Sequence, residues 1–151
     1  MLIALLTTLG TLAFTQQTDT LGGTGSNSAG DNTYKMNTFD VVTDATLDEI
    51  EAYLNPQVNN AEAVFVVYEE GGGGQAWNLL WNSGLVAISQ GAGFKSSGNV
   101  NVALDAGTYY AIGVYLPDDT EYFWDNVGDE NLGYANVDGS YWSNNGTVFG
   151  G

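Results

Sequence analysis

The sequence contains no cysteine and no histidine, and its only basic residues are Lys35 and Lys95. Without cysteine the chain has no disulfide bonds and no thiol nucleophile. Without histidine it lacks the usual base of a nucleophilic hydrolase and the commonest zinc ligand. Glycoside hydrolysis needs only two carboxylates, but the chain has no arginine or histidine to position a substrate. We therefore expect that the protein is not an enzyme.

Positive charge is scarce, since 18 acidic residues and two basic ones give a formal net charge of −16. A chain this acidic repels phosphate backbones and anionic lipid surfaces, which excludes nucleic acid as a partner. Glycine, asparagine, threonine and tyrosine are abundant, and together with the scarcity of lysine they indicate an extracellular or cell-surface protein. One sequon, Asn145-Gly146-Thr147, makes Asn145 a candidate glycosylation site.

One long uncharged run opens the chain: MLIALLTTLGTLAFTQ. A secretory signal normally begins with lysine or arginine, which this run lacks, and a membrane span needs about 20 apolar residues. An uncleaved signal and a membrane helix stay as alternatives. The favoured interpretation is a retained β-strand buried on both faces, because apolar residues occupy both alternating sets of positions. The residues expected to contact a neighbouring subunit are Leu2, Ile3, Leu5, Leu6, Leu9, Leu12 and Phe14.

Composition divides the rest of the chain into two parts. Residues 17–32 are rich in glycine, serine and threonine, and we expect a flexible linker there. Residues 33–151 are expected to form one β-sandwich domain, because short strand-like segments alternate with turn residues at regular intervals. The predicted fold class is therefore all-β, a single sandwich with an extended N-terminal strand arm.

The hydrophobic pattern assigns two of the strand regions. Residues 100–104 and 108–116 alternate apolar and polar positions around Asp105-Ala106-Gly107, which predicts two neighbouring strands paired as a hairpin. Residues 44–54 fit helical spacing, with a cap and acids in the first turn. They also alternate apolar residues with acids, and the all-β context favours a strand.

Two further apolar segments read as strands. The run AVFVVYEE is continuously apolar for six residues, which suits a strand covered on both faces. In QAWNLLWN the alternation predicts Trp77, Leu79 and Trp81 on one side of a strand.

The segments LDEIEAYLN, AVFVVYEE and VALDAGTYYAIGVY, within about residues 33–116, resemble jelly-roll-like β-sandwich modules of secreted bacterial proteins. The resemblance implies a two-sheet sandwich but no particular function, since such modules serve sugar binding, adhesion and assembly alike. The apolar arm and its linker resemble the donor strands of pili and filaments that assemble by strand exchange. That likeness implies copies of the same chain as partners.

The C-terminal third carries two candidate binding sites. Its carboxylates are the ligand type that calcium prefers, so calcium is the one metal ion the residues suggest, with Asp118, Asp119, Asp125 and Asp129 as candidate ligands. Aromatic rings beside carboxylates and amides suit stacking on sugar rings. The candidate sugar-binding residues are Trp124, Tyr134, Tyr141 and Trp142. No other cofactor is expected.

The function predicted from these features is structural. We expect a subunit of an extracellular filament that polymerises by inserting its N-terminal strand into the neighbouring subunit, because an apolar strand exposed to water seeks a partner. The alternative is a secreted carbohydrate-binding or adhesion module, with or without calcium, whose partner is a polysaccharide. Neither function includes a membrane span.

Overall fold

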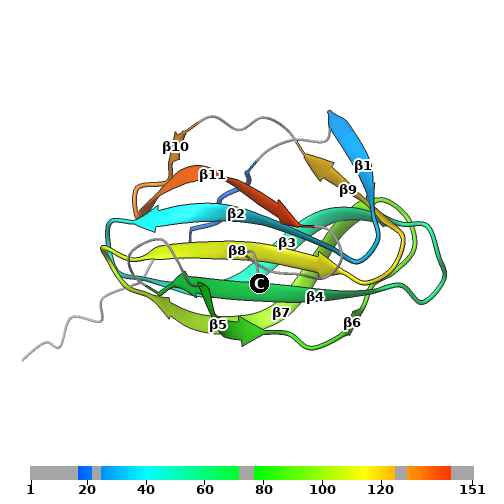
Figure 1. Cartoon of the computed structure of the whole chain (residues 1–151), viewed down its shortest axis with the longest axis horizontal. Helices are drawn as coiled ribbons and strands as arrows, with labels where there is room; N and C mark the ends of the chain where they lie inside the picture. Colours follow the sequence, from blue (N-terminus) through cyan, green and yellow to red (C-terminus); the bar gives the residue numbers. More distant parts are fainter. Residues whose placement is uncertain (1–16, 22–24, 72–76, 125–128, 144–151) are drawn as a thin grey trace, which may run out of the picture.

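The strands of this protein form two antiparallel sheets (Figure 1). The computed structural model describes residues 17–21, 25–71, 77–124 and 129–143, and no helix occurs among them. The small sheet has the order β1-β9-β3-β7, and the large sheet has the order β10-β11-β2-β8-β4-β5, with β6 paired to β4. The strands are β1 (Ser26–Gly30), β2 (Thr33–Val41), β3 (Ala45–Pro56), β4 (Glu62–Glu70), β5 (Trp77–Asn82), β6 (Val86–Ala87), β7 (Gly93–Leu104), β8 (Tyr109–Leu116), β9 (Thr120–Trp124), β10 (Glu130–Asn131) and β11 (Ala135–Ser143).

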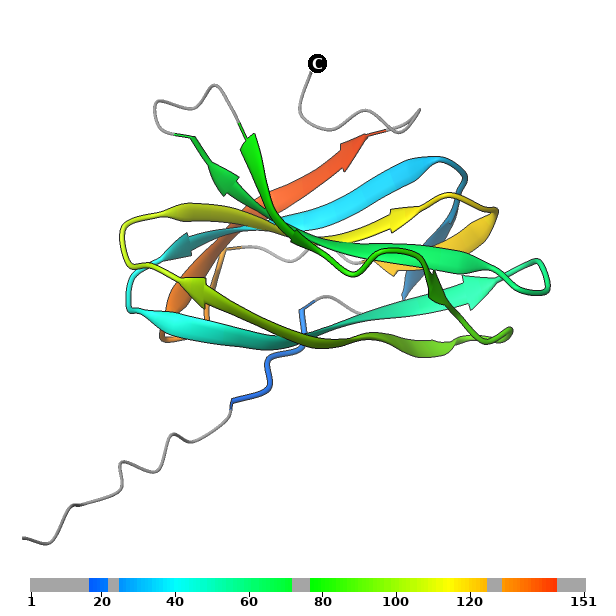
Figure 2. The ribbon, with the colours of Figure 1, turned by 90° about the horizontal axis from the view of Figure 1, so that it is seen from below.

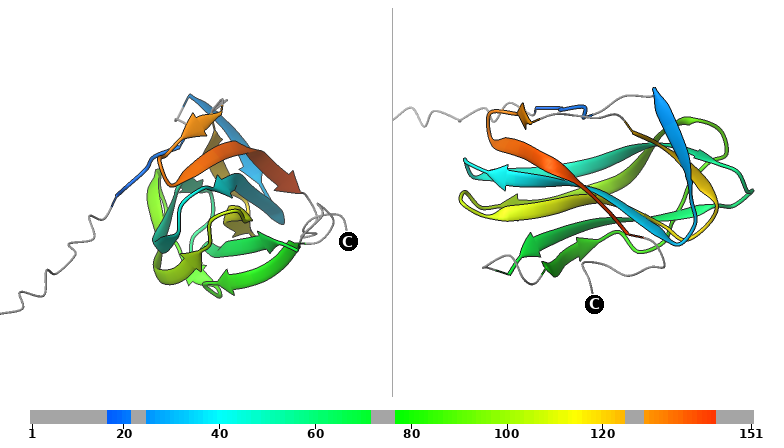
Figure 3. Two further views of the ribbon diagram at one scale, coloured as in Figure 1. Left: turned by 90° about the vertical axis from the view of Figure 1, so that its left-hand side faces the viewer. Right: turned by 45° about the horizontal axis from the view of Figure 1, so that its top comes forward.

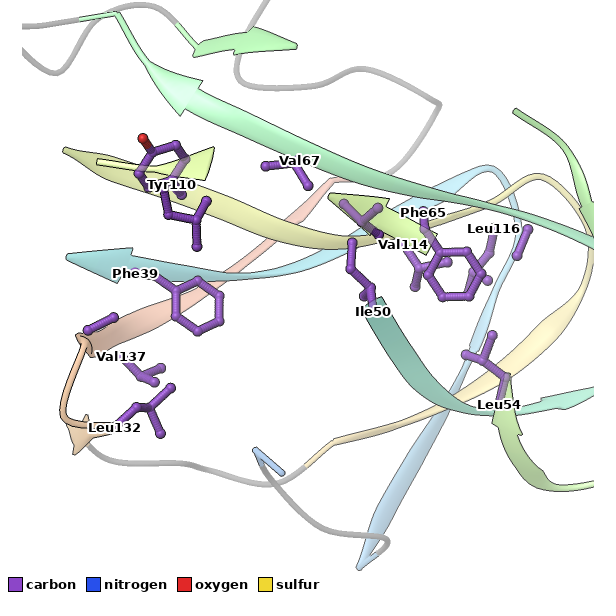
Figure 4. Packing of buried hydrophobic residues seen from close by; sticks show 14 of the residues in the cluster. Phe39, Ile50, Leu54, Phe65, Val67, Tyr110, Val114, Leu116, Leu132 and Val137 are labelled. Atoms are coloured by element: carbon purple, nitrogen blue, oxygen red, sulfur yellow. The ribbon is translucent and has the colours of Figure 1, made fainter. Parts of the chain in front are cut away.

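The two sheets pack face to face as a sandwich (Figure 2). Their facing sides enclose one cluster of buried side chains, to which Leu54 contributes from the small sheet and Phe65, Tyr110 and Leu116 from the large one (Figure 4). Burial of apolar surface between two sheets is the main stabilising contribution in such a fold. The predicted all-β sandwich is confirmed. None of the described residues belongs to a helix long and apolar enough to cross a membrane.

A second, smaller cluster lies on the outer face of the large sheet. It consists of Met36, Val66, Tyr68 and Ala111, all less than 9% exposed. Strand β4 therefore buries both of its faces, with Val66 on one side and Val67 on the other. This confirms the two-sided strand predicted from AVFVVYEE.

The connection between β7 and β8 corrects the hairpin prediction. Both strands form where the pattern placed them, but β7 pairs with β3 in the small sheet and β8 pairs with β2 and β4 in the large sheet. Residues 105–108 therefore arch from one sheet to the other. The physical reason is that both strands carry apolar side chains on the face that meets the core. Val100 and Leu104 of β7 and Val114 of β8 lie in the one buried cluster between the two sheets.

Strand β3 confirms the choice of strand over helix for residues 44–54. Ile50 and Leu54 are buried, while Glu49 and Glu51 on either side of Ile50 are exposed. The register with β7 shifts on both sides of Glu49, and at this irregularity the Ile50 amide donates a 2.9 Å hydrogen bond to Ser97 Oγ instead of to a backbone carbonyl. Tertiary pairing has overridden a helical local preference.

Strand β5 corrects the expectation that Trp77, Leu79 and Trp81 share one side. The register between β4 and β5 shifts where Val67 and Tyr68 face Trp81 and Leu79, so that β5 carries one extra residue, Leu80, and the face that it presents changes there. Trp81, opposite Val67, packs against the main core, whereas Trp77 packs against the cluster on the outer face. Leu79, opposite Tyr68, is 49% exposed.

The segment predicted as a flexible linker contributes to the sandwich. Ser26–Gly30 forms β1, which pairs with β9 at one edge of the small sheet. Upstream, Gln17 Nε2 donates a 3.1 Å hydrogen bond to the carbonyl of Leu132, and Leu21 packs against the main core. Figure 3 shows residues 17–21 in dark blue beside β10 and β11. The linker expectation is corrected here, because backbone pairing and apolar burial hold these residues in place.

Candidate functional site

The predicted subunit-interface residues lie in the apolar arm, residues 1–16, which is outside the described residues. The predicted glycosylation site Asn145 and the predicted calcium ligand Asp125 also lie outside them. These three predictions stay predictions.

The described candidate calcium ligands do not come together. Asp118 and Asp119 lie in the turn between β8 and β9, whereas Asp129 lies beside β10. Figure 1 shows that turn and β10 at opposite ends of the sandwich. Asp118 has a structural role, since its Oδ2 accepts a 3.3 Å hydrogen bond from the amide of Glu62. Within the described ranges, no group of three or more acidic side chains is arranged to hold a metal ion.

An acidic pocket surrounds Asp129. Its volume is about 320 Å³. It is lined by Asp40, Tyr109, Asp129, Glu130, Asn131, Asn136, Val137 and Asp138. The carboxylates of Asp40 and Asp138 raise the pKa of Tyr109, because a tyrosinate there would face like charges. The pocket is therefore strongly negative, which makes it unsuitable for anions.

Two of the four predicted sugar-binding residues have structural roles. The carbonyl of Tyr134 accepts hydrogen bonds from the amides of Val42 and Thr43, at 2.8 and 3.1 Å, and its ring packs against the main core. Burial, followed by the Asp19 carboxylate, raises the pKa of the Tyr134 hydroxyl. Tyr141 packs against the cluster on the outer face of the large sheet. Both rings are therefore partly buried by packing within the fold, and their role in sugar binding stays a prediction.

The other two predicted sugar-binding residues remain accessible. Trp142 of β11 is 62% exposed, and Trp124 at the end of β9 is 43% exposed. The indole Nε1 of Trp124 donates a 3.3 Å hydrogen bond to Ser28 Oγ on β1. Trp142 pairs with Lys35, whose Nζ lies 5.0 Å from the centroid of the Trp142 ring.

An aromatic row that the sequence analysis missed crosses the outer face of the small sheet. It consists of Phe94 on β7, Tyr53 on β3 and Phe123 on β9. The Tyr53 ring centroid lies 5.2 Å from that of Phe94 and 5.0 Å from that of Phe123, both edge to face. The row points outward because Tyr53 lies between the core-facing residues Ala52 and Leu54 of its strand. This alternation was visible in the sequence, but the register that aligns the three rings was not.

Polar groups accompany this row. Asn55 Nδ2 donates a 2.6 Å hydrogen bond to Glu121 Oε2, and both residues lie two positions along their strands from a ring of the row. Ser96, two residues from Phe94, donates a hydrogen bond to Glu49. Phe94 is 56% exposed. The outer face of the small sheet therefore combines one exposed ring, Phe94, and two half-buried rings, Tyr53 and Phe123, with carboxylate, amide and hydroxyl groups.

Comparisons with known proteins add little to this geometry. No protein-family model matches the chain, and no curated protein sequence matches it. Among solved structures, the chain is similar to the crystal structure of the Yersinia pseudotuberculosis-derived mitogen (YPM), with 11% sequence identity and a TM-score of 0.31. The similarity covers 73% of this chain and 93% of that chain. A TM-score this low carries no argument about function.

Proposed function

We propose that this protein is an extracellular carbohydrate-binding module that holds a polysaccharide on the outer face of its small sheet. The observation that carries the proposal is the aromatic row of Phe94, Tyr53 and Phe123. Aromatic side chains on the outer face of a sheet do not contribute to the core between the sheets. Because the Phe94 side chain is more than half exposed, the folded protein lacks the free energy that its full burial would contribute. A ligand that covers the row would recover that free energy.

The chemistry of this face suits a sugar chain better than a protein partner. Sugar rings offer apolar C–H faces to aromatic rings and hydroxyl groups to polar side chains. The Asn55–Glu121 and Ser96–Glu49 pairs supply acceptors and donors on the same face as the rings. The row spans three adjacent strands, β7, β3 and β9, so it offers an extended contact to a linear chain.

Binding to insoluble and soluble polysaccharides tests this proposal. Cellulose, chitin and xylan are the probes, and the variants are Phe94→Ala and Tyr53→Ala. Each variant is expected to weaken binding about tenfold, which corresponds to about 1.4 kcal/mol. Leu79→Ala is the matched control, because Leu79 is an exposed apolar residue, at 49%, on β5 at the edge of the other sheet. If the two row variants bind as the control does, or if the unmodified protein binds none of the probes, the proposal is wrong.

A second candidate function is the filament subunit, which the edge of the large sheet supports. Strand β5, with the sequence WNLLWN, pairs only with β4 among the described residues. It carries no charge, and its residues Leu79 and Leu80 are 49% and 45% exposed. Uncharged edge strands of this kind favour the addition of a further strand. On this second proposal, residues 1–16 of a neighbouring copy add to β5.

Light scattering and electron microscopy distinguish the filament from a monomeric module. Deletion of residues 1–16 and the substitution Leu80→Lys are each expected to prevent polymerisation, since one removes the incoming strand and the other places a charge on the edge that receives it. The substitution Leu80→Lys is also expected to leave the sandwich folded, because the Leu80 side chain is exposed. A full-length chain that stays monomeric at high concentration would exclude this second function.

A further inference from the structure

Lys35 occupies an unusual position for a charged residue, because its side chain bridges the two sheets. It lies on β2 opposite Trp142 of β11 and Val114 of β8, within the large sheet. Its Nζ nevertheless lies 4.3 Å from the ring centroid of Tyr122, which belongs to β9 of the small sheet. With the Trp142 ring at 5.0 Å, the ammonium is held between aromatic rings of both sheets.

One exposed tryptophan, Trp142, belongs to this site, and a second, Trp124, lies farther along β9. Trp142 is the more exposed, and Trp124 lies two residues from Tyr122 on β9, so its side chain leaves the strand on the same face. We call Lys35, Tyr122 and Trp142 the lysine–aromatic cluster, with Trp124 farther along β9. It differs from the aromatic row, because Tyr122 faces inward and packs against the main core while the row lies on the opposite face of the small sheet.

The ammonium of Lys35 has unused hydrogen-bonding capacity. The described part of this chain of net charge −16 contains no ion pair between a lysine and an acidic side chain. Lys95, the other basic residue, is 8% exposed and donates to Ser89 Oγ at 3.1 Å and to the Gly91 carbonyl at 2.9 Å. Lys95 is thus satisfied within the fold, whereas the described contacts of Lys35 are two ring faces. Its three N–H donors suit an anionic group from outside.

We propose that the lysine–aromatic cluster binds a carboxylated sugar, such as a uronic acid residue. The Lys35 ammonium takes the carboxylate in charge-assisted hydrogen bonds, and an exposed tryptophan ring takes the apolar face of the sugar. A ligand needs both a carboxylate and a sugar ring, because a simple anion cannot stack on the tryptophan and a neutral sugar cannot pair with the Lys35 ammonium. The site is independent of the aromatic row and does not rest on polysaccharide binding there.

The overall charge of the protein limits which acidic sugars bind well. Long polyanions are repelled by the acidic surface, whereas a short ligand meets mainly the local field of Lys35. At physiological ionic strength, charges beyond about 8 Å are largely screened. We therefore expect short acidic oligosaccharides to bind more tightly per sugar residue than long acidic polymers.

Isothermal titration calorimetry with trigalacturonic acid and its methyl ester tests the proposal on the full chain. The acid is expected to bind the unmodified protein about tenfold more tightly than the neutral ester. Lys35→Met keeps the apolar stem and removes the charge, so it should weaken binding of the acid to the level of the ester. Trp142→Ala should weaken both ligands. Phe94→Ala, outside the cluster, should change neither.

Several results would overturn the proposal. Equal binding of acid and ester, no measurable binding of the acid, or unchanged binding of the acid to Lys35→Met would each show that Lys35 has only a structural role. A urea unfolding curve for each variant separates lost binding from lost folding. Loss of acid binding in Phe94→Ala would place the acidic sugar on the aromatic row and would also overturn the assignment to this cluster.

Discussion

The hydroxyl of Tyr110 accepts a 2.9 Å hydrogen bond from the backbone amide of Asp105, across the arch that carries the chain from β7 in one sheet to β8 in the other. Tyr110 is 1% exposed, so the arch is tied directly to the core. The end of β2 supports the same arch, because the amide of Gly107 donates to the carbonyl of Val41 at 2.7 Å. The connection between the sheets is thus held by the side chain of Tyr110 on β8 and the backbone of Val41 on β2, two adjacent strands of the large sheet.

Tyr110→Phe is expected to lower the free energy of unfolding by about 1 kcal/mol, because it removes this hydrogen bond while keeping the buried ring. Urea denaturation followed by tryptophan fluorescence measures the change. Tyr109→Phe is the control. Because Tyr109 is more accessible than Tyr110, removal of its hydroxyl should lower the free energy of unfolding by less. Equal costs for the two variants would show that the hydroxyl of Tyr110 does not stabilise the arch.

Gly113→Ala is expected to lower the free energy of unfolding by about 2–3 kcal/mol, since a methyl group there overpacks the sheet. A Cβ at Gly113 would clash with the backbone carbonyl oxygen of Lys35 and would lie 2.6 Å from Met36 Cα. Gly93→Ala is the matched control: it is also a strand glycine, and a Cβ there meets only the end of the Lys95 side chain, at 4.0 Å. Thermal unfolding of both variants checks the prediction, and similar melting temperatures would contradict it.

Thr120→Val is expected to raise the free energy of unfolding by about 1 kcal/mol. Thr120 is 0% exposed, and its hydroxyl has no hydrogen-bond partner among the residues that the structure describes, so the isosteric valine removes a buried polar group that is not compensated. Thr33→Val should have the opposite effect, because the buried Thr33 hydroxyl donates a 2.9 Å hydrogen bond to the Asp31 carbonyl. Chemical denaturation of the two variants, Thr120→Val and Thr33→Val, shows whether each substitution raises or lowers the free energy of unfolding. A destabilised Thr120→Val would mean that the hydroxyl is hydrogen-bonded after all.

Stability is expected to fall at alkaline pH because of the buried tyrosines. Burial raises the pKa of Tyr68, with Tyr34 adding to it, and burial followed by the Asp19 carboxylate raises that of Tyr134. Since the folded state holds these protons more tightly, the stabilisation is fully present below the ordinary tyrosine pKa of about 10 and is lost as the pH rises through the raised value. Tyr134→Phe should therefore show a smaller loss of stability above pH ~10. Urea titrations on both sides of that pH measure it, and an unchanged pH dependence would contradict the prediction.

Part of the candidate sites could be found from the sequence. Trp124 and Trp142 were predicted as sugar-binding residues, and the structure leaves both exposed, with the Trp142 ring beside Lys35. Tyr134 and Tyr141 belonged to the same prediction but pack against the two apolar clusters. A sequence shows that an aromatic residue is present, but its burial depends on the strands that cover it.

The sequence by itself determined that the fold is all-β and where several strands lie, such as residues 100–104 and 108–116, because alternation of apolar and polar residues has the period of a strand whatever its neighbours are. For residues 44–54, which also fit helical spacing, the tertiary pairing with β7 and β9 decided for the strand. Only the tertiary structure decided which strands pair. A turn such as Asp105-Ala106-Gly107 serves a hairpin or an arch between sheets equally well, and the choice depends on which apolar faces meet in the core. The aromatic row and the lysine–aromatic cluster depend on the same choice, since each joins residues from three different strands. Contacts of that kind follow from sheet order and register, which pairing over long separations sets and local sequence does not.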